Sequence, residues 1–344
     1  METARELFWI PADDTRYVYS VAVVRALEHT LLRRKTLEAM ARADSAREAL
    51  QELSETSYSR FMSSGVTESS FEHILRDVLK DTYELMHTLM IDSELSKAIL
   101  SMYDYQNLKA VMESRLAQIE TIQGVVPFGM VSVDALETAV DSGTWHDIPD
   151  YLINAYNAAS KSYERHKDPR ILEIIIDIQS MEQRIDPLVR VPDRSIRAYA
   201  RAFADTANLK LLIRLNRMNP DLTTLERAFC SRGSLPFDLF SSLLGKGTPS
   251  IIEQFSSSPY NKALRDGLTY LDEQGSYSVL DRELENILIG HLIQSKFAVF
   301  GPAPLICHVL AREHEVRMVR LIMSAKINKI PVERIVARLS MLYV

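Results

Sequence analysis

Residues 104–112 read Asp-Tyr-Gln-Asn-Leu-Lys-Ala-Val-Met, and residues 205–213 read Asp-Thr-Ala-Asn-Leu-Lys-Leu-Leu-Ile. Both stretches place Asp, Asn, Leu and Lys at the same positions, in a pattern typical of an α-helix. A longer match follows each of them: residues 129–156 align with 233–260 without a gap, at an offset of 104 instead of 101. The chain therefore repeats one helical unit, and the difference of three residues falls in the loop between the two matches.

Two further regions resemble this unit more loosely. Residues 312–320, Arg-Glu-His-Glu-Val-Arg-Met-Val-Arg, carry Glu315 where the other copies have asparagine, and residues 31–53, followed by Thr-Ser-Tyr at 56–58, form another partial counterpart. Three copies of about 100–115 residues account for the length of the chain. We therefore expect three similar helical subdomains, at residues 1–124, 125–228 and 229–344.

Signals for helix ends recur within the longer match. Asp134 and Asp238 are expected as N-caps, because a short acidic side chain can accept from the free N–H groups of a first turn. Gly143 and Gly247 are expected just past the helix ends, where a left-handed backbone favours glycine. The threonine after each glycine is expected to open the next helix.

Composition favours the same architecture. Glycine supplies 11 of 344 residues, about half of its usual share, and positive-φ turns and phosphate-binding loops both depend on glycine. We therefore predict an all-α fold of long helices joined by short links. The 46 acidic residues outnumber the 40 basic ones, whereas a nucleic-acid-binding protein usually shows a basic excess, so no nucleic-acid partner is expected.

The cysteines and the most apolar stretch favour a protein of the cytoplasm. The two cysteines lie 77 positions apart without a Cys-x-x-Cys motif, which indicates a reducing compartment and no metal knuckle. Between Glu285 and Arg312 the only formal charge is Lys296, so a membrane span has to be considered. The sequence Gly-Pro-Ala-Pro at 301–304 interrupts this stretch, and we expect two buried helices that meet there.

Two motifs suggest chemistry that the rest of the sequence does not support. Residues 244–248, Leu-Gly-Lys-Gly-Thr, lack the earlier glycine and the Ser or Thr directly after lysine that a phosphate-binding loop needs, so a turn that ends a helix is favoured. Glu84 and His87 have the Glu-x-x-His spacing of a di-iron bundle, but no second pair completes such a site. We expect no nucleotide, metal or other cofactor, and no catalytic residue.

The polar positions of the repeat are the candidate functional residues. Asparagine is mildly unfavourable inside a helix, yet it stands in equivalent helices of two copies. We favour the interpretation that the amides bond an adjoining helix and fix the packing of each copy; the alternative is that these helices line a surface where a partner docks. The positions are Asp104, Asn107, Lys109, Asp205, Asn208, Lys210, Glu315 and Arg317.

Taken together, these motifs resemble those of a known family. Residues 17–32, Tyr-Val-Tyr-Ser-Val-Ala-Val-Val-Arg-Ala-Leu-Glu-His-Thr-Leu-Leu, and then 45–53 and 56–58, are similar to the C-type subunit of the archaeal and bacterial A/V-type rotary ATPases. The d-type subunit of the eukaryotic vacuolar ATPase belongs to the same family. The Asn-Leu-Lys helices resemble its recurrent element, as do residues 313–322 and 330–335, and the likeness spans about residues 17–339.

The resemblance implies a funnel of three similar helical subdomains around a pseudo-threefold axis, at the cytoplasmic face of the membrane. The funnel would rest on the membrane rotor ring of proteolipid subunits and receive the central stalk, with its D-type and F-type subunits. Its role would be mechanical and non-catalytic: to couple ATP hydrolysis or synthesis to proton or sodium movement.

Two other classes of protein stay open. One is a free cytoplasmic helical adaptor, against which the length of the repeats counts, because common helical repeats run about 34–47 residues. The other is an all-α enzyme, which would need a convergent set of ionisable groups that the sequence does not reveal.

Overall fold

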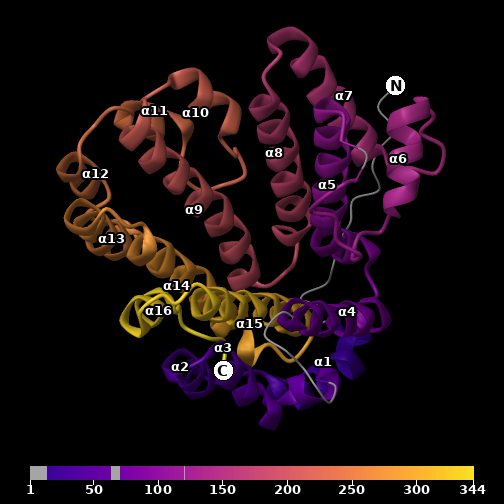
Figure 1. Ribbon diagram of the computed structural model, residues 1–344, viewed down its shortest axis with the longest axis vertical. Helices are drawn as coiled ribbons and strands as arrows, with labels where there is room; N and C mark the ends of the chain where they lie inside the picture. Colours follow the sequence, from indigo (N-terminus) through magenta and orange to yellow (C-terminus); the bar gives the residue numbers. More distant parts are fainter. Residues whose placement is uncertain (1–13, 63–69, 120) are drawn as a thin grey trace. The chain divides into compact units, whose positions relative to one another are not determined.

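The computed structural model describes residues 14–62, 70–119 and 121–344. Within these ranges every regular element is a helix, as the glycine-poor, periodic sequence predicts (Figure 1). The α-helices are α1 (Val18–Leu27), α2 (Arg34–Arg42), α3 (Ala46–Gln51), α4 (Phe71–Leu89), α5 (Ser93–Ala117), α6 (Val133–Ser142), α7 (Asp150–His166), α8 (Pro169–Leu188), α9 (Arg194–Met218), α10 (Leu222–Ala228), α11 (Phe237–Leu243), α12 (Thr248–Gln254), α13 (Asn261–Gln274), α14 (Ser278–Gln294), α15 (Ala303–Ile327) and α16 (Val332–Arg338).

The described residues divide into two compact units. Unit 1 holds residues 92–119, 121–190 and 200–245, and unit 2 holds residues 14–62, 70–91, 191–199 and 246–344. The division of the chain into three subdomains at 1–124, 125–228 and 229–344 stays a prediction.

A bundle of α5, α6, α7 and α8 forms one core of unit 1. Helix α8 packs against both α5 and α7 (Figure 1), and Leu108, Leu136, Leu152 and Leu172 meet in a buried cluster. Asp168 caps the start of α8 by accepting from the N–H of Arg170, and Pro169 stands at the first helical position. The apolar stripes of these helices are thus used for packing within the unit.

Unit 2 is built around α15. Every residue from 303 to 316 is buried, the charged ones included, and helices α1, α2, α3, α4, α14 and α16 all pack against α15 or against each other. The stretch 285–312 forms two helices, as expected, with a turn at Gly301 and Pro302 before α15. Its α15 part is buried, but much of its α14 part is only half-buried, and Phe297 and Val299 between the helices are exposed. No helix within the described ranges combines the length and the apolar character that crossing a bilayer needs.

The predicted N-caps are wrong. Ser132 caps α6 by accepting from the N–H of Ala135, and α11 begins after Pro236. Asp134 and Asp238 lie in the first turns of these helices instead. A carboxylate in the first turn also interacts favourably with the positive end of the helix dipole. Aspartate is therefore common both at the N-cap and in the first turn, and the sequence alone does not distinguish the two positions.

The predicted glycine at the end of the helix is found in the first copy only, and the predicted threonine at the start of the next helix is found in the second copy only. Gly143 ends α6 in the left-handed conformation with φ 70°, but in the second copy the left-handed glycine is Gly245, and Gly247 is the N-cap of α12. Thr248 opens α12 as predicted, whereas the helix after Thr144 begins only at residue 150. The turn at 244–248 ends α11, the interpretation preferred over a phosphate-binding loop.

Gly267 lets α13 and α14 approach closely, which leads to a testable prediction. A Cβ built on it would lie 2.6 Å from the Cα of Leu280, and backbone cannot move aside cheaply. We expect Gly267→Ala to lower the free energy of unfolding by about 2 kcal/mol. Gly290→Ala on the same hairpin would meet no atom within 4 Å and should raise it by about 0.5–1 kcal/mol. Urea denaturation of both variants measures the difference, and equal effects would contradict the close contact.

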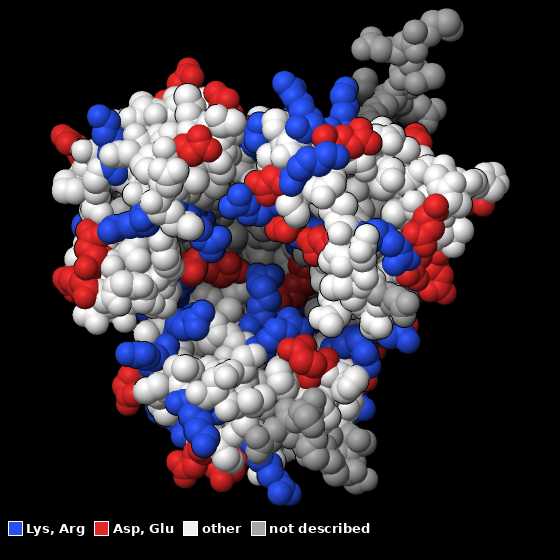
Figure 2. Space-filling model, turned by 45° about the horizontal axis from the view of Figure 1, so that its top comes forward, with Lys and Arg blue, Asp and Glu red and all other residues white. Residues whose placement is uncertain are grey.

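Charged side chains of both signs lie on the surface. Figure 2 shows Lys and Arg interspersed with Asp and Glu over the face in view. Ion pairs such as Arg115–Asp141 and Arg232–Asp186 join neighbouring segments of unit 1. Because these pairs are partly exposed, each adds little to stability.

Candidate functional site: polar clasps on the repeated helices

Asp104 and Asn107 hold the loop that follows α5. Asn107 is buried; its Nδ2 donates to the carbonyl of Val126 and its Oδ1 accepts from the N–H of the same residue, both at 2.9 Å. Asp104 accepts from the N–H of Val131 at 2.9 Å and from the hydroxyl of Tyr151 at 2.7 Å. We name this arrangement, Asp104 and Asn107 with the loop 126–131, the first clasp.

Asp205 and Asn208 on α9 repeat this geometry on the loop 230–235, the second clasp. Asn208 donates to the carbonyl of Cys230 and accepts from its N–H, both at 2.9 Å. Asp205 accepts from the N–H groups of Ser234 and Leu235 at 2.9 and 3.0 Å, and from the hydroxyl of Ser234. The repeat in the sequence is therefore also a repeat in hydrogen bonding.

Each of these two clasps contains a glycine at the point of closest approach. A Cβ on Gly129 would lie 2.3 Å from Oδ1 of Asp104, and one on Gly233 would lie 2.2 Å from Oδ1 of Asp205. No side chain fits at such a distance, so the loop reaches the buried carboxylate only where the residue is glycine. The sequence match aligned the two glycines but did not reveal their contact with the aspartates.

Helix α15 carries a charged counterpart, the third clasp, made of Arg312 and Glu315 with residues 30–32 and 57–58. Both charged side chains are buried, with 7% and 2% of their surface exposed. Glu315 accepts from the backbone N–H of Leu32 and from the hydroxyl of Tyr58, the latter at 2.7 Å. Arg312 donates to Glu315 and to the hydroxyl of Thr30, the latter at 2.8 Å. In this copy the clasped segments precede the helix in the sequence instead of following it.

Burial and neighbouring charge set the protonation of the clasps. Burial, followed by the negative charge of Glu315, raises the pKa of Tyr58 well above its ordinary value, so the phenol stays a donor. Burial opposes the charge of Arg312, but the carboxylate of Glu315 holds the pKa of that guanidinium above its ordinary value. Burial also raises the pKa of Asp104, in spite of the groups that donate to it.

The basic members of the predicted set lie nearer to solvent. Lys109 pairs with Asp177 on α8, with 2.7 Å between Nζ and Oδ1, and Lys210 is half-buried. Arg317 pairs with Glu285 on α14, and 49% of its side chain is exposed. Burial would raise the pKa of Glu285, but the hydrogen bond with His314 and the charge of Arg317 hold it well below its ordinary value.

The clasps bind segments of the chain rather than a ligand. Within residues 14–62, 70–119 and 121–344, no group of three or more His, Cys, Asp or Glu side chains is placed to hold a metal ion. Glu84 and His87 lie exposed on α4. Burial raises the pKa of Cys230 to about 11 and that of Cys307 to about 12, so both thiols stay protonated and unreactive.

His308 lies one turn before Arg312, and it makes the stability of the chain depend on pH. It is buried, and its Nδ1 has no hydrogen-bond partner among the described residues. Burial, together with the charge of Arg312, lowers the pKa of His308 to about 3. An unfolded histidine takes up a proton near pH 6.5. The folded state therefore loses stability as the pH falls from about 6.5 toward 3.

We expect His308→Leu to remove this loss, which amounts to about 2 kcal/mol between pH 7 and pH 5. Urea denaturation at the two pH values measures it. His87→Leu, at an exposed histidine of α4, is the matched control and should keep the pH dependence of the unmodified chain. An unchanged slope in His308→Leu would contradict the burial of a neutral imidazole.

A comparison with known families covers nearly the whole chain and all three clasps. The family model described as ATP synthase (C/AC39) subunit matches residues 20–338. The chain belongs to this family. The resemblance to the C-type subunit of rotary ATPases, identified from the sequence, is thus confirmed.

Individual members of the C/AC39 family are similar to the chain at low identity but over most of its length. The C-type subunit of the V-type sodium ATPase of Enterococcus hirae is 20% identical over 323 residues, which are 93% of this chain and 97% of that protein. The C-type subunit of the A-type ATP synthase of Thermococcus gammatolerans is 22% identical over 323 residues, 89% of this chain and 85% of that protein. Its counterpart in the A-type ATP synthase of a Desulfurococcus species is 23% identical over 340 residues, 93% of this chain and 90% of that protein.

Proposed function

We propose that the chain is the non-catalytic component that couples the central stalk to the membrane rotor ring of an A/V-type rotary ATPase or ATP synthase. The observation that carries this proposal is the family match over residues 20–338. The names of the relatives, which belong to a V-type sodium ATPase and to A-type ATP synthases, support the same class of machine. The proposed partners are stalk subunits of the D and F type and the proteolipid ring. The proposed form is a peripheral funnel of three subdomains on the cytoplasmic face.

A mechanical role is supported by features that make each unit stiff. A protein that transmits torque has to resist deformation, and close-packed helices have low compressibility. The first and second clasps fix loops to α5 and α9 through pairs of hydrogen bonds from a buried asparagine. The third clasp ties residues 30–32 and 57–58 to α15.

Within the repeat, the positions proposed to face a partner are Lys109, Lys210 and Arg317. The other five positions of the set are buried, and each of them holds a segment of its own unit. A buried group can reach a partner only if its clasp opens, so the docking interpretation is proposed for the basic positions alone.

Copurification from membranes tests the proposal. A tagged chain is expected to bring down the stalk and ring subunits together. Complexes rebuilt without the chain should still hydrolyse ATP but lose ATP-driven ion transport, and the isolated chain should show no ATPase activity. A chain that recovers neither partner would be the free adaptor, and turnover of a substrate by the chain alone would indicate an enzyme.

A further inference from the structure

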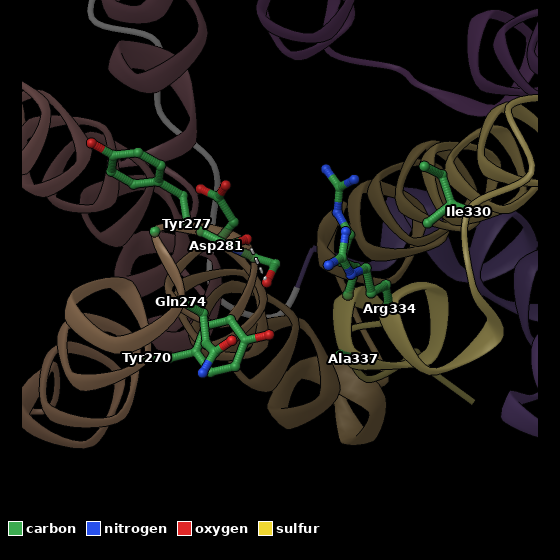
Figure 3. A pocket seen from close by; sticks show the side chains of 11 residues that line it. Tyr270, Gln274, Tyr277, Asp281, Ile330, Arg334 and Ala337 are labelled. Carbon is green, nitrogen blue, oxygen red and sulfur yellow. Dashed lines mark hydrogen bonds between the residues drawn. The ribbon is translucent and has the colours of Figure 1, made fainter.

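A polar groove lies between the α13–α14 turn and α16 in unit 2, with a volume of about 490 Å³. Figure 3 shows its two walls: Tyr270, Gln274 and Tyr277 lie on the side of the turn, and Ile330 and Arg334 lie opposite. Arg338 lines the same wall as Arg334. We name this cavity the α16 groove.

The two arginines of the α16 groove carry charge that the fold does not use. Arg334 and Arg338 lie one turn apart and are exposed, and neither guanidinium has a hydrogen bond or ion pair within the described residues. Like charges at this spacing repel and weaken a helix by about 0.2–0.5 kcal/mol. By contrast, Arg282 and Arg317 on neighbouring helices are each paired with a glutamate. The two guanidiniums are therefore free to pair with a partner from outside the chain.

The remaining lining residues define the chemistry of that partner. Tyr270 and Gln274 add a hydroxyl and an amide to the wall opposite the arginines, whereas the hydroxyl of Tyr277 points away from Arg334. The two guanidiniums, with these polar groups beside them, suit a carboxylate. Asp281 also lines the groove, but it already has an interaction within the chain. Ile330, with 36% of its surface exposed, adds an apolar contact beside the arginines. Such a mixed, open surface suits a protein segment better than a small free anion, which needs an enclosing pocket.

We propose, on the basis of the function proposed above, that the α16 groove binds an acidic, partly apolar segment of one of the central-stalk proteins. Two carboxylates one helical turn apart pair with Arg334 and Arg338, and an apolar side chain packs on Ile330. Charge complementarity of this kind fixes the partner's register and speeds its encounter.

Charge reversal in the assembled complex tests this proposal. We expect R334E/R338E to reduce the recovery of stalk subunits on the tagged chain about tenfold at physiological salt, while the ring is still recovered. R33E/R47E is the matched control, because Arg33 and Arg47 are also exposed residues of unit 2 and the change in net charge is the same. Thermal melts followed by circular dichroism compare the folding of both variants. R334Q/R338Q only removes the charges and should also reduce the recovery of stalk subunits. It replaces R334E/R338E in the test if the charge reversal impairs folding.

The possible outcomes separate this proposal from the proposed function. If the unmodified chain recovers the stalk and R334E/R338E recovers it equally well, the groove is not the docking site and the coupling role stands. If the unmodified chain recovers no stalk, the coupling role itself fails, and this proposal fails with it. Titration with inorganic phosphate, followed by NMR, tests whether the α16 groove binds a small free anion instead of a protein segment. Saturable phosphate binding that R334E/R338E abolishes, with stalk recovery intact, would make the groove a small-anion site and overturn the proposal.

Discussion

Arg312→Met is expected to lower the free energy of unfolding by about 3–5 kcal/mol. The substitution removes the guanidinium that faces Glu315 and leaves the carboxylate in the core of unit 2, where 2% of its side chain is exposed. An uncompensated buried charge destabilises much more than a missing pair, because the interior neither solvates nor neutralises it. Urea denaturation at pH 7 measures the loss.

Two comparisons isolate the cause of this loss. Arg320→Met removes another arginine of α15, but its side chain is 41% exposed, and the pair with Glu72 should contribute less than about 1 kcal/mol. The double variant Arg312→Met/Glu315→Gln should recover most of the loss. The neutral amide can still accept from the N–H of Leu32 through its oxygen, and its NH2 group can donate to the hydroxyl oxygen of Tyr58. A loss as large in the double variant as in the single one would rule out the unpaired charge as the cause.

The sequence predicts the first two clasps only in part: the repeat marks both asparagines, but their partners Val126 and Cys230 lie in loops and not, as expected, in an adjoining helix. Asn107 bonds a residue 19 positions further on, and Asn208 bonds one 22 positions further on. The difference of three is the same as the difference between the two sequence offsets, 101 and 104. The extra residues lie between the second helix and its clasped loop, where α10 is found. The all-α class and the internal repeat could be predicted because helical periodicity and motif spacing can be recognised within short stretches of the sequence.

The third clasp could not be predicted in the same way. Leu32 and Glu315 are 283 positions apart, and a contact between distant segments leaves no periodic pattern in either of them. The sequence carries one signal of the third clasp: in residues 312–320 both polar positions change together, the aspartate to Arg312 and the asparagine to Glu315. The first two copies have an aspartate and an asparagine at these positions, and the third copy has an arginine and a glutamate, which form an ion pair. This joint change indicates that the third copy holds a different segment of the chain. The family resemblance, in contrast, needed only the order of motifs along the chain.

Asn208→Leu should lower the free energy of unfolding by about 3 kcal/mol, and Asn107→Leu by only about 1 kcal/mol, although the two residues occupy the same position of the repeat. Both asparagines are 1% exposed, and each exchanges two hydrogen bonds with one backbone residue. The difference lies in the partners. Cys230 is fully buried, so its N–H and C=O would both stay unpaired, whereas Val126 is half-buried and water can replace the lost amide.

Denaturation of both variants, with Asn154→Leu on the exposed face of α7 as control, measures this asymmetry; the control should stay within about 0.5 kcal/mol of the unmodified chain. Losses of equal size at the two asparagines would mean that the burial of the clasped backbone does not decide the effect.

The same variants separate the two interpretations of the repeat. An amide that only fixes a loop predicts normal recovery of stalk subunits under conditions where Asn107→Leu is folded. Loss of the stalk without loss of stability would instead place Asn107 at the docking surface, and the first clasp would then have to open when the partner binds.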